Sequence, residues 1–210
     1  MTTSEPTIVQ PDAQHADILA DAFLDDPFMA WIFGDHAARV AALPTWWAFI
    51  GANSPEGAEL WRIDDGAASL WHPPHHAGEP EPEPEPEPAE GDDGQEEEPN
   101  PFVEMMLPFV GGRLPEILDM LGSGRELHPD EPHWYLLALG TRAATQGHGL
   151  GARIVRPVLE RCDREGIGAY LESSNPRNIP FYHRLGFEIV NENWTPDNVA
   201  VMTGMWRAPR

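Results

Sequence analysis

The spacing of apolar residues alternates between a strand period and a helix period along the chain. Short apolar runs predict strands at 7–10, 59–63, 67–71, 133–141 and 169–173, with a hairpin turn at 64–66. Apolar residues three and four positions apart predict helices that begin after Asp12, cover 37–50, 102–110 and 114–121, include 154–159 and cover 180–185. We expect Asp25-Asp26-Pro27 to end the first helix and Gly122 to end the helix at 114–121. Strands that alternate with helices predict an α/β fold.

One segment lacks this pattern. Residues 79–98 read EPEPEPEPEPAEGDDGQEEE, with 11 acidic residues and no basic ones. Alternating prolines prevent helix and central strand, and repelling carboxylates favour an extended chain, so we expect a disordered acidic insertion. The alternative is a segment that recruits a basic partner or a cationic substrate. Because both flanks continue one α/β pattern, we expect a single domain over 1–210, interrupted by 79–98.

Charge excludes several classes of function. The chain has 35 Asp and Glu against 13 basic residues, a formal net charge of -22, and all 13 basic residues are arginine. The absence of lysine excludes a P-loop lysine and a pyridoxal Schiff base. The acidic balance argues against binding to nucleic acid or to an anionic membrane. No apolar run reaches the length of a membrane span, and the N-terminus does not resemble a signal peptide, so we expect a cytoplasmic protein.

A glycine-rich loop follows the apolar strand at 133–141. The loop lies before the helix that includes 154–159. It consists of Gln146, Gly147, His148, Gly149, Leu150 and Gly151. Strand, glycine loop and helix together form an anion-binding arrangement, because backbone amides approach a phosphate and the helix N-terminus carries partial positive charge. The alternative is a loop whose glycines serve tight packing alone.

These residues resemble the GNAT superfamily of N-acetyltransferases. The resemblance rests on the Gln-x-x-Gly-x-Gly motif at 146–151, on Asn178, on Tyr182 and on the pair Gly186-Phe187. Over 131–190 the sequence is similar to puromycin N-acetyltransferase and its relatives. The resemblance implies the GNAT fold, a central mixed β-sheet flanked by helices on both faces. It also implies that acetyl-CoA enters where the central strand and the next strand separate, and that the N-terminal helices build the acceptor pocket.

The resemblance also implies a set of site residues. The amide of Leu139 would bind the thioester carbonyl, and Thr141 would contact the pantetheine arm. The cofactor-binding loop would be Gln146, Gly147, His148, Gly149, Leu150 and Gly151, joined by Asn178. Tyr182 matches the tyrosine that donates a proton to the departing thiolate of coenzyme A, or else it is an aromatic residue packed under the sheet.

Glu172 is the candidate general base. Strand alternation places its side chain opposite to that of Leu171, toward the acceptor side of the cleft, where it accepts a proton directly or through water. The alternative is a structural carboxylate that holds Arg177 or a loop amide.

Cysteine and histidine indicate no further chemistry. Cys162 lies inside a predicted helix with no histidine at triad spacing, so we expect a small apolar core residue. His72, His75 and His76 are separated by two prolines and lack a cluster of other ligands, so we expect no metal site.

The sequence therefore predicts an acetyl-CoA-dependent N-acetyltransferase. It would acetylate a primary amine of a small, cationic molecule by direct transfer while both substrates are bound. One alternative is acetylation of a peptide or protein amine. Another is a non-catalytic domain that binds acyl-CoA and acts as a sensor or interaction module. No motif specifies the acceptor or an oligomeric state.

Overall fold

A computed structural model describes residues 4–74, 100–125 and 127–210. The acidic insertion at 79–98 lies outside these residues. Within them, seven strands form one sheet in the order β1-β2-β3-β4-β5-β7-β6. The strands are β1 (Thr7–Val9), β2 (Glu59–Ile63), β3 (Ala67–His72), β4 (His133–Thr141), β5 (Gly168–Ser173), β6 (Glu188–Trp194) and β7 (Val201–Arg207). Only β4 and β5 pair in parallel, so the sheet is mixed, as the sequence predicted.

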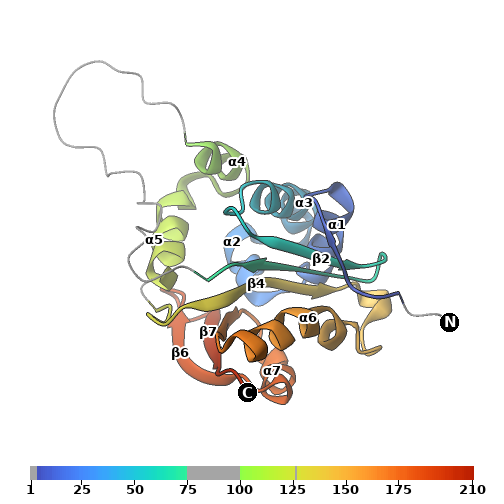
Figure 1. Cartoon of the computed structure of the whole chain (residues 1–210). Helices are drawn as coiled ribbons and strands as arrows, with labels where there is room; N and C mark the ends of the chain where they lie inside the picture. Colours follow the sequence, from blue (N-terminus) through green and yellow to red (C-terminus); the bar gives the residue numbers. More distant parts are fainter. Residues whose placement is uncertain (1–3, 75–99, 126) are drawn as a thin grey trace, which may run out of the picture.

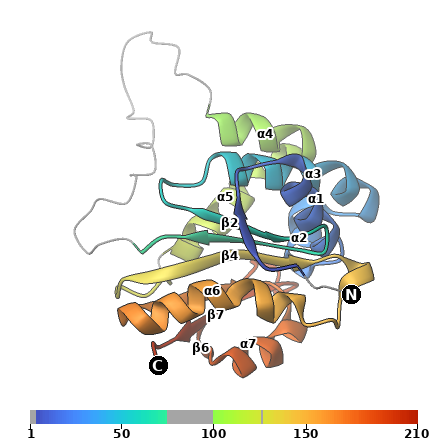
Figure 2. The ribbon, with the colours of Figure 1, turned by 45° about the vertical axis from the view of Figure 1, so that its right-hand side comes forward.

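Helices cover both faces of the sheet (Figures 1 and 2). The helices on one face are α1 (Ala13–Ala22), α2 (Pro27–Phe33), α3 (His36–Ala52), α4 (Pro101–Val110) and α5 (Leu114–Arg125). The other face carries α6 (Leu150–Glu165) and α7 (Ile179–Leu185). Each face has its own core. The first buries Ile18, Leu43 and Met106, and the second buries Ile154, Val158 and Phe187.

The α1 helix packs very closely against β4. A Cβ atom on Gly140 would lie 2.6 Å from the Cβ of Ala22 and 3.2 Å from a methyl carbon of Leu19. Space for α1 therefore depends on the absence of a side chain at Gly140. This contact sets the distance between α1 and the C-terminal half of β4, the part of the strand that separates from β5.

Three sequence predictions need correction. Asp26 does not end a helix but begins one, because its carboxylate accepts hydrogen bonds from the amides of Phe28 and Met29 at the start of α2. The α5 helix continues past Gly122 to Arg125, since a single glycine weakens a helix without ending it. The last strand, β7, was not predicted. It pairs with both β5 and β6, so the sheet encloses it as a buried strand.

Candidate active site

The strands β4 and β5 pair over only part of their length. Their parallel register runs from His133 opposite Gly168 to Leu136 opposite Leu171 and stops there. At the same point the register between β3 and β4 shifts, because Leu70 pairs with Ala138 and the adjacent Trp71 pairs with Leu136. The extra residue is a bulge, which bends the strand. The C-terminal half of β4 therefore pairs with β3 alone and leaves an opening on its β5 side.

Two predicted cofactor residues lie in this half of β4. Leu139 is partly buried and packs against the core under α6. Thr141 is the last residue of the strand, and a Cβ on Gly151 would lie 4.0 Å from its methyl carbon. Both residues therefore lie between the opening and the N-terminus of α6, and their contacts with the thioester and the pantetheine arm stay predictions.

The glycine-rich loop joins β4 to α6 and leaves its amides uncovered. Gly147 and Gly149 have positive φ values of 79° and 75°, and no atom lies within 4 Å of the position that a Cβ would occupy on either. No side chain caps the start of α6. Helix N-termini without a cap hold unpaired N–H groups and partial positive charge, which suit a phosphate.

The other loop residues support this conformation. Gln146 donates a hydrogen bond to the carbonyl of Thr141 at 3.4 Å, and a ring nitrogen of His148 lies 3.1 Å from the carbonyl of Thr145. Both side chains are exposed. Asn178 is also exposed and lies at the start of α7, the helix beside α6.

Tyr182 lies on α7 and is buried, with 7% of its surface exposed. Its ring packs against Phe181 and Phe187 at centroid distances of 5.1 and 6.1 Å. Its hydroxyl forms no hydrogen bond within the described residues, so it is available to a ligand. Burial, and then the charge of Asp26, raise the pKa of Tyr182, which keeps the phenol protonated and able to donate.

Asp26 connects the N-terminal helices to the end of β5. One carboxylate oxygen caps α2, and the other accepts a hydrogen bond of 2.6 Å from the hydroxyl of Ser174. Asp26 is 6% exposed, and burial raises its pKa. Its charge also acts on Tyr182, which belongs to the layer on the opposite face of the sheet. Asp26 therefore lies past the end of the β4 and β5 pairing, close enough to Tyr182 on the other face for its charge to affect that phenol.

The raised pKa of Asp26 predicts a measurable pH effect on stability. A carboxyl group with a higher pKa in the folded state favours folding while it is protonated, and this contribution is lost as the pH rises through the folded pKa. Asp26→Asn keeps an oxygen that can cap α2 and removes the titration. We therefore expect the Tm of the variant minus the Tm of the wild type to increase between about pH 4 and pH 7. Thermal denaturation at a series of pH values measures this difference, and a decrease would contradict the assignment.

Glu172 lies on the opposite face of β5 from the buried Leu171, as strand alternation predicted. Its side chain is 10% exposed, and its Oε2 atom accepts a hydrogen bond of 3.1 Å from the hydroxyl of Tyr135. The same oxygen lies 3.8 Å from Nε2 of His128. A Cβ on Gly124 of α5 would lie 3.5 Å from Oε1, so α5 covers this carboxylate. Among the described residues, neither Arg177 nor a loop amide forms a hydrogen bond or an ion pair with Glu172.

Aromatic rings surround this carboxylate. The rings of Tyr135 and Tyr170 lie side by side in the parallel register, with centroids 5.9 Å apart. Burial first, and then the charge of Glu172, raise the pKa of Tyr135 well above its ordinary value. The same two causes, in the same order, raise the pKa of Tyr170. Both phenols therefore stay protonated, and Tyr135 acts as a hydrogen-bond donor to Glu172.

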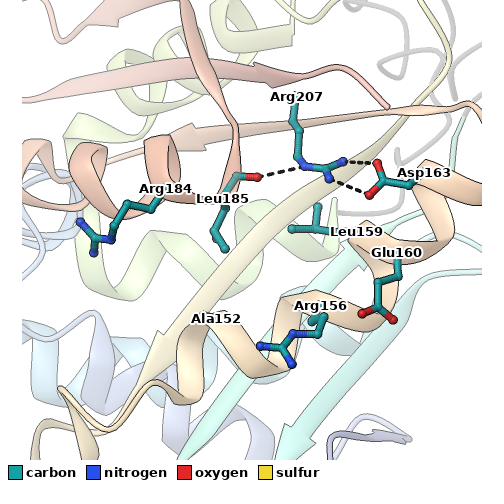
Figure 3. A pocket seen from close by; sticks show the side chains of 8 residues that line it. All are labelled: Ala152, Arg156, Leu159, Glu160, Asp163, Arg184, Leu185 and Arg207. Atoms are coloured by element: carbon teal, nitrogen blue, oxygen red, sulfur yellow. Dashed lines mark hydrogen bonds and ion pairs between the residues drawn. The ribbon is translucent and has the colours of Figure 1, made fainter. Parts of the chain in front are cut away.

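A shallow pocket lies on the outer side of α6 and α7 (Figure 3). Its volume is about 210 Å³, and it is lined by Ala152, Arg156, Leu159, Glu160, Asp163, Arg184, Leu185 and Arg207. Arg207 is held by a two-pronged ion pair with Asp163 at 2.8 Å and by the carbonyl of Leu185. Arg156 and Arg184 form no ion pair with any described residue. Their guanidinium groups are therefore available to an anion.

Three other predictions can be compared with the structure. Cys162 is fully buried, and burial raises the pKa of its thiol to about 11, as expected of a core residue. His75 and His76 lie outside the described residues, and the residues that are described include no group of three or more side chains arranged to hold a metal ion. No helix in the described ranges is both long and apolar enough to cross a membrane.

The family model for the acetyltransferase (GNAT) family matches residues 69–187, more than half of the chain. The protein therefore belongs to the GNAT family, enzymes that transfer an acetyl group from acetyl-CoA to an amine. Over 58 residues the chain is 40% identical to an uncharacterized N-acetyltransferase of Schizosaccharomyces pombe. That match covers 28% of this chain and 24% of the yeast protein, so the chain spans about a quarter of this relative.

Solved structures of other acetyltransferases share the fold. A histone acetyltransferase HPA2-related protein of Corynebacterium glutamicum has a TM-score of 0.67 and 19% identity, covering 100% of this chain and 98% of the other. An agmatine N-acetyltransferase has a TM-score of 0.55 and 17% identity, covering 97% and 100%. A Drosophila melanogaster polyamine N-acetyltransferase has a TM-score of 0.52 and 18% identity, covering 97% and 100%. These similarities confirm the predicted GNAT fold.

The sequence did not single out the partners of the predicted residues. Ser174, Tyr135 and His128 contact Asp26 or Glu172, but no motif assigned them a role. One signal was present for the strand residues: Tyr135, Tyr170 and Glu172 share a face if β4 and β5 pair in parallel. Another was the order Asp26-Pro27, since aspartate followed by proline is typical of a helix start.

Proposed function

We propose that this protein acetylates the primary amine of a small cationic molecule, by direct attack of the amine on acetyl-CoA while both are bound. The observation that carries the proposal is a pair of carboxylates past the end of the β4 and β5 pairing, the buried Asp26 and the largely covered Glu172. Among the residues whose side chains the structure describes, neither carboxylate forms an ion pair with an arginine, and the one ionisable cation near Glu172 is His128 at 3.8 Å. Buried carboxylates are ordinarily paired with a cation, and a bound ammonium group would supply one.

The residues along the opening suit the parts of acetyl-CoA. The uncovered amides of Gly147, Gly149 and the start of α6 would hold the pyrophosphate, with Arg156 and Arg184 available to further phosphate oxygens. The pantetheine arm would follow Thr141 into the opening. There the amide of Leu139 would donate to the thioester carbonyl and stabilise the oxyanion that forms on it.

Two side chains would move the protons. A primary amine is an ammonium ion at neutral pH and must lose a proton before it can attack. Glu172 would accept that proton, and the amine nitrogen would then form a bond to the thioester carbon. As the carbon–sulfur bond breaks, Tyr182 would donate its phenolic proton to the thiolate of coenzyme A, and the second proton that the amine nitrogen loses on becoming an amide would return to the phenolate of Tyr182.

Similarity in fold agrees with a small acceptor. Two of the solved relatives are named for agmatine and for polyamines, which are small cations with primary amines. The likeness of residues 131–190 to puromycin N-acetyltransferases makes puromycin a second acceptor to test.

The direct test measures release of coenzyme A from acetyl-CoA in the presence of single amines. The panel is agmatine, putrescine, spermidine, puromycin and a histone tail peptide. Acetylation of a small polycation with the highest kcat/KM is expected. A higher kcat/KM for the peptide would show that the acceptor is a peptide or protein amine. Tight binding of acetyl-CoA without transfer to any amine would favour a non-catalytic sensor.

Binding of acetyl-CoA should depend on Gly149. At about 100 times its Kd, a ligand stabilises the folded state by about 2.7 kcal/mol, which for a chain of this size raises the Tm by about 5–10 °C. Gly149→Glu places a negative charge beside the predicted pyrophosphate, and we expect it to abolish this increase. Thermal denaturation with and without acetyl-CoA measures the effect.

A matched variant separates charge from backbone strain. Gly149 has a positive φ of 75°, which asparagine tolerates better than most residues. Gly149→Asn is neutral, so it should retain part of the increase in Tm. A full increase in Gly149→Glu would show that the phosphates bind elsewhere.

A further inference from the structure

We propose that His128 accepts the proton that Glu172 takes from the amine and releases it to water. The inference rests on the proposed function and adds a second group to its proton path. His128 would act through Glu172, without contact with the acceptor.

The positions of the two side chains support a path to solvent. Glu172 is 10% exposed, whereas His128 is 23% exposed. Nε2 of His128 lies 3.8 Å from Oε2 of Glu172, so a shift of about 1 Å or one bridging water brings the pair within reach for proton transfer. The imidazole is the more exposed of the two, and therefore it can exchange a proton with water while the carboxylate stays covered by α5.

Aromatic contacts hold the imidazole in place. Its ring centroid lies 4.6 Å from that of Tyr135 and 4.7 Å from that of Tyr170. These two rings come from adjacent strands, so the imidazole is held between β4 and β5 above Glu172. A loop side chain fixed by two strands has little freedom to lose when it accepts a proton.

The other groups that face His128 are phenols that stay protonated and a histidine with a ring nitrogen against a backbone carbonyl. Burial and the charge of Glu172 raise the pKa of Tyr135 and of Tyr170, so both stay protonated. His133 lies with its ring 5.8 Å from that of His128, and its Nδ1 atom is 2.7 Å from the carbonyl of Glu131. Of the described groups in contact with Glu172, the imidazole of His128 is the one with a ring nitrogen that can accept a proton and pass it on.

The proton transfer is balanced. An N–H bond of the bound ammonium breaks and an O–H bond forms on Glu172, which leaves a neutral amine with a free electron pair. The carboxyl proton then moves to Nε2 of neutral His128, and Glu172 recovers its charge. The imidazolium releases the proton to water, and the amine attacks the thioester carbon.

The experiment compares pH profiles of kcat/KM for the best amine acceptor of the panel, with three variants of the full chain. His128→Gln removes the base. His128→Phe also removes it but keeps an aromatic ring between Tyr135 and Tyr170. His36→Gln changes an exposed histidine in the first turn of α3, with no contact to Glu172 or His128 within the described residues, and serves as the control.

We expect both His128 variants to lose about tenfold in kcat/KM at pH 7 and to approach the wild type near pH 9, where water and hydroxide accept the proton more readily. The control should follow the wild type at every pH. Imidazole added to the buffer should restore part of the rate at pH 7 in His128→Gln. Partial rescue is the readout that a purely structural role would not produce.

Other outcomes would overturn the inference. A wild-type profile in His128→Phe would show that the ring serves packing alone. An equal loss at pH 7 and pH 9, with no rescue by imidazole, would indicate damage to the site. If the wild type acetylated no amine of the panel at any pH, the proposed function would fail first, and the inference with it.

Discussion

Tyr182→Phe is expected to lower kcat for acetyl transfer by about 10²-fold or more, the usual range for removal of a general acid. The substitution removes only the hydroxyl, which has no hydrogen-bond partner in the described residues. The ring that packs against Phe181 and Phe187 is kept. We therefore expect an unchanged Tm and a Kd for acetyl-CoA within about twofold of the wild type. Steady-state release of coenzyme A and calorimetric titration measure the two effects.

A packing variant provides the control for this prediction. Phe187→Leu disturbs the ring beside Tyr182 and should cost about 1–2 kcal/mol of stability, while it leaves the hydroxyl in place. Its Tm should fall, and its kcat should stay within a few fold of the wild type. If Tyr182→Phe retained full turnover, single-turnover measurements would show whether product release hides the chemical step. An unaltered single-turnover rate in Tyr182→Phe would show that Tyr182 is not the general acid.

Much of the fold could be predicted because its signals are local. The apolar strand at 133–141, the glycine loop and the apolar face around Ile154 each depend on residues close together in sequence. The hairpin of β2 and β3 could be predicted for the same reason, since its turn lies at Asp64-Asp65-Gly66. Tyr182 was predicted by resemblance and Glu172 by strand alternation, and their catalytic roles stay predictions; the structure places Glu172 one residue past the end of the β4 and β5 pairing and Tyr182 in the core beside α6.

The remaining features depend on long-range pairing. The bulge in β4 appears only in its register with β3, where Trp71 pairs with Leu136. The hydrogen bond between Ser174 and Asp26 joins residues 148 positions apart. His128 meets Glu172 because α5 and the loop after it cover one face of the sheet, and no periodicity specifies that placement. Tertiary packing determines such contacts, so local sequence patterns give no signal for them.

The partners of Glu172 bear on the choice between a general base and a structural carboxylate. A structural carboxylate would act mainly through its hydrogen bond from Tyr135, the one direct hydrogen bond to its side chain from a described residue. A base would act through its own charge and proton affinity. Two substitutions separate these roles, because one removes the charge and the other removes the hydrogen bond.

Glu172→Gln should lower kcat/KM for the amine by about 10²- to 10³-fold, since the amide keeps the shape of the side chain but accepts no proton. The increase in Tm with acetyl-CoA should persist, because the cofactor loop lies on the other side of the opening. Tyr135→Phe leaves the carboxylate charged and removes only its donor, so we expect a loss of about tenfold or less. Measurement of kcat/KM, Tm and acetyl-CoA binding in both variants decides between the roles. Equal losses in the two variants, with equal decreases in Tm, would mean that Glu172 serves to hold Tyr135, and the proton acceptor would then have to be sought at Asp26.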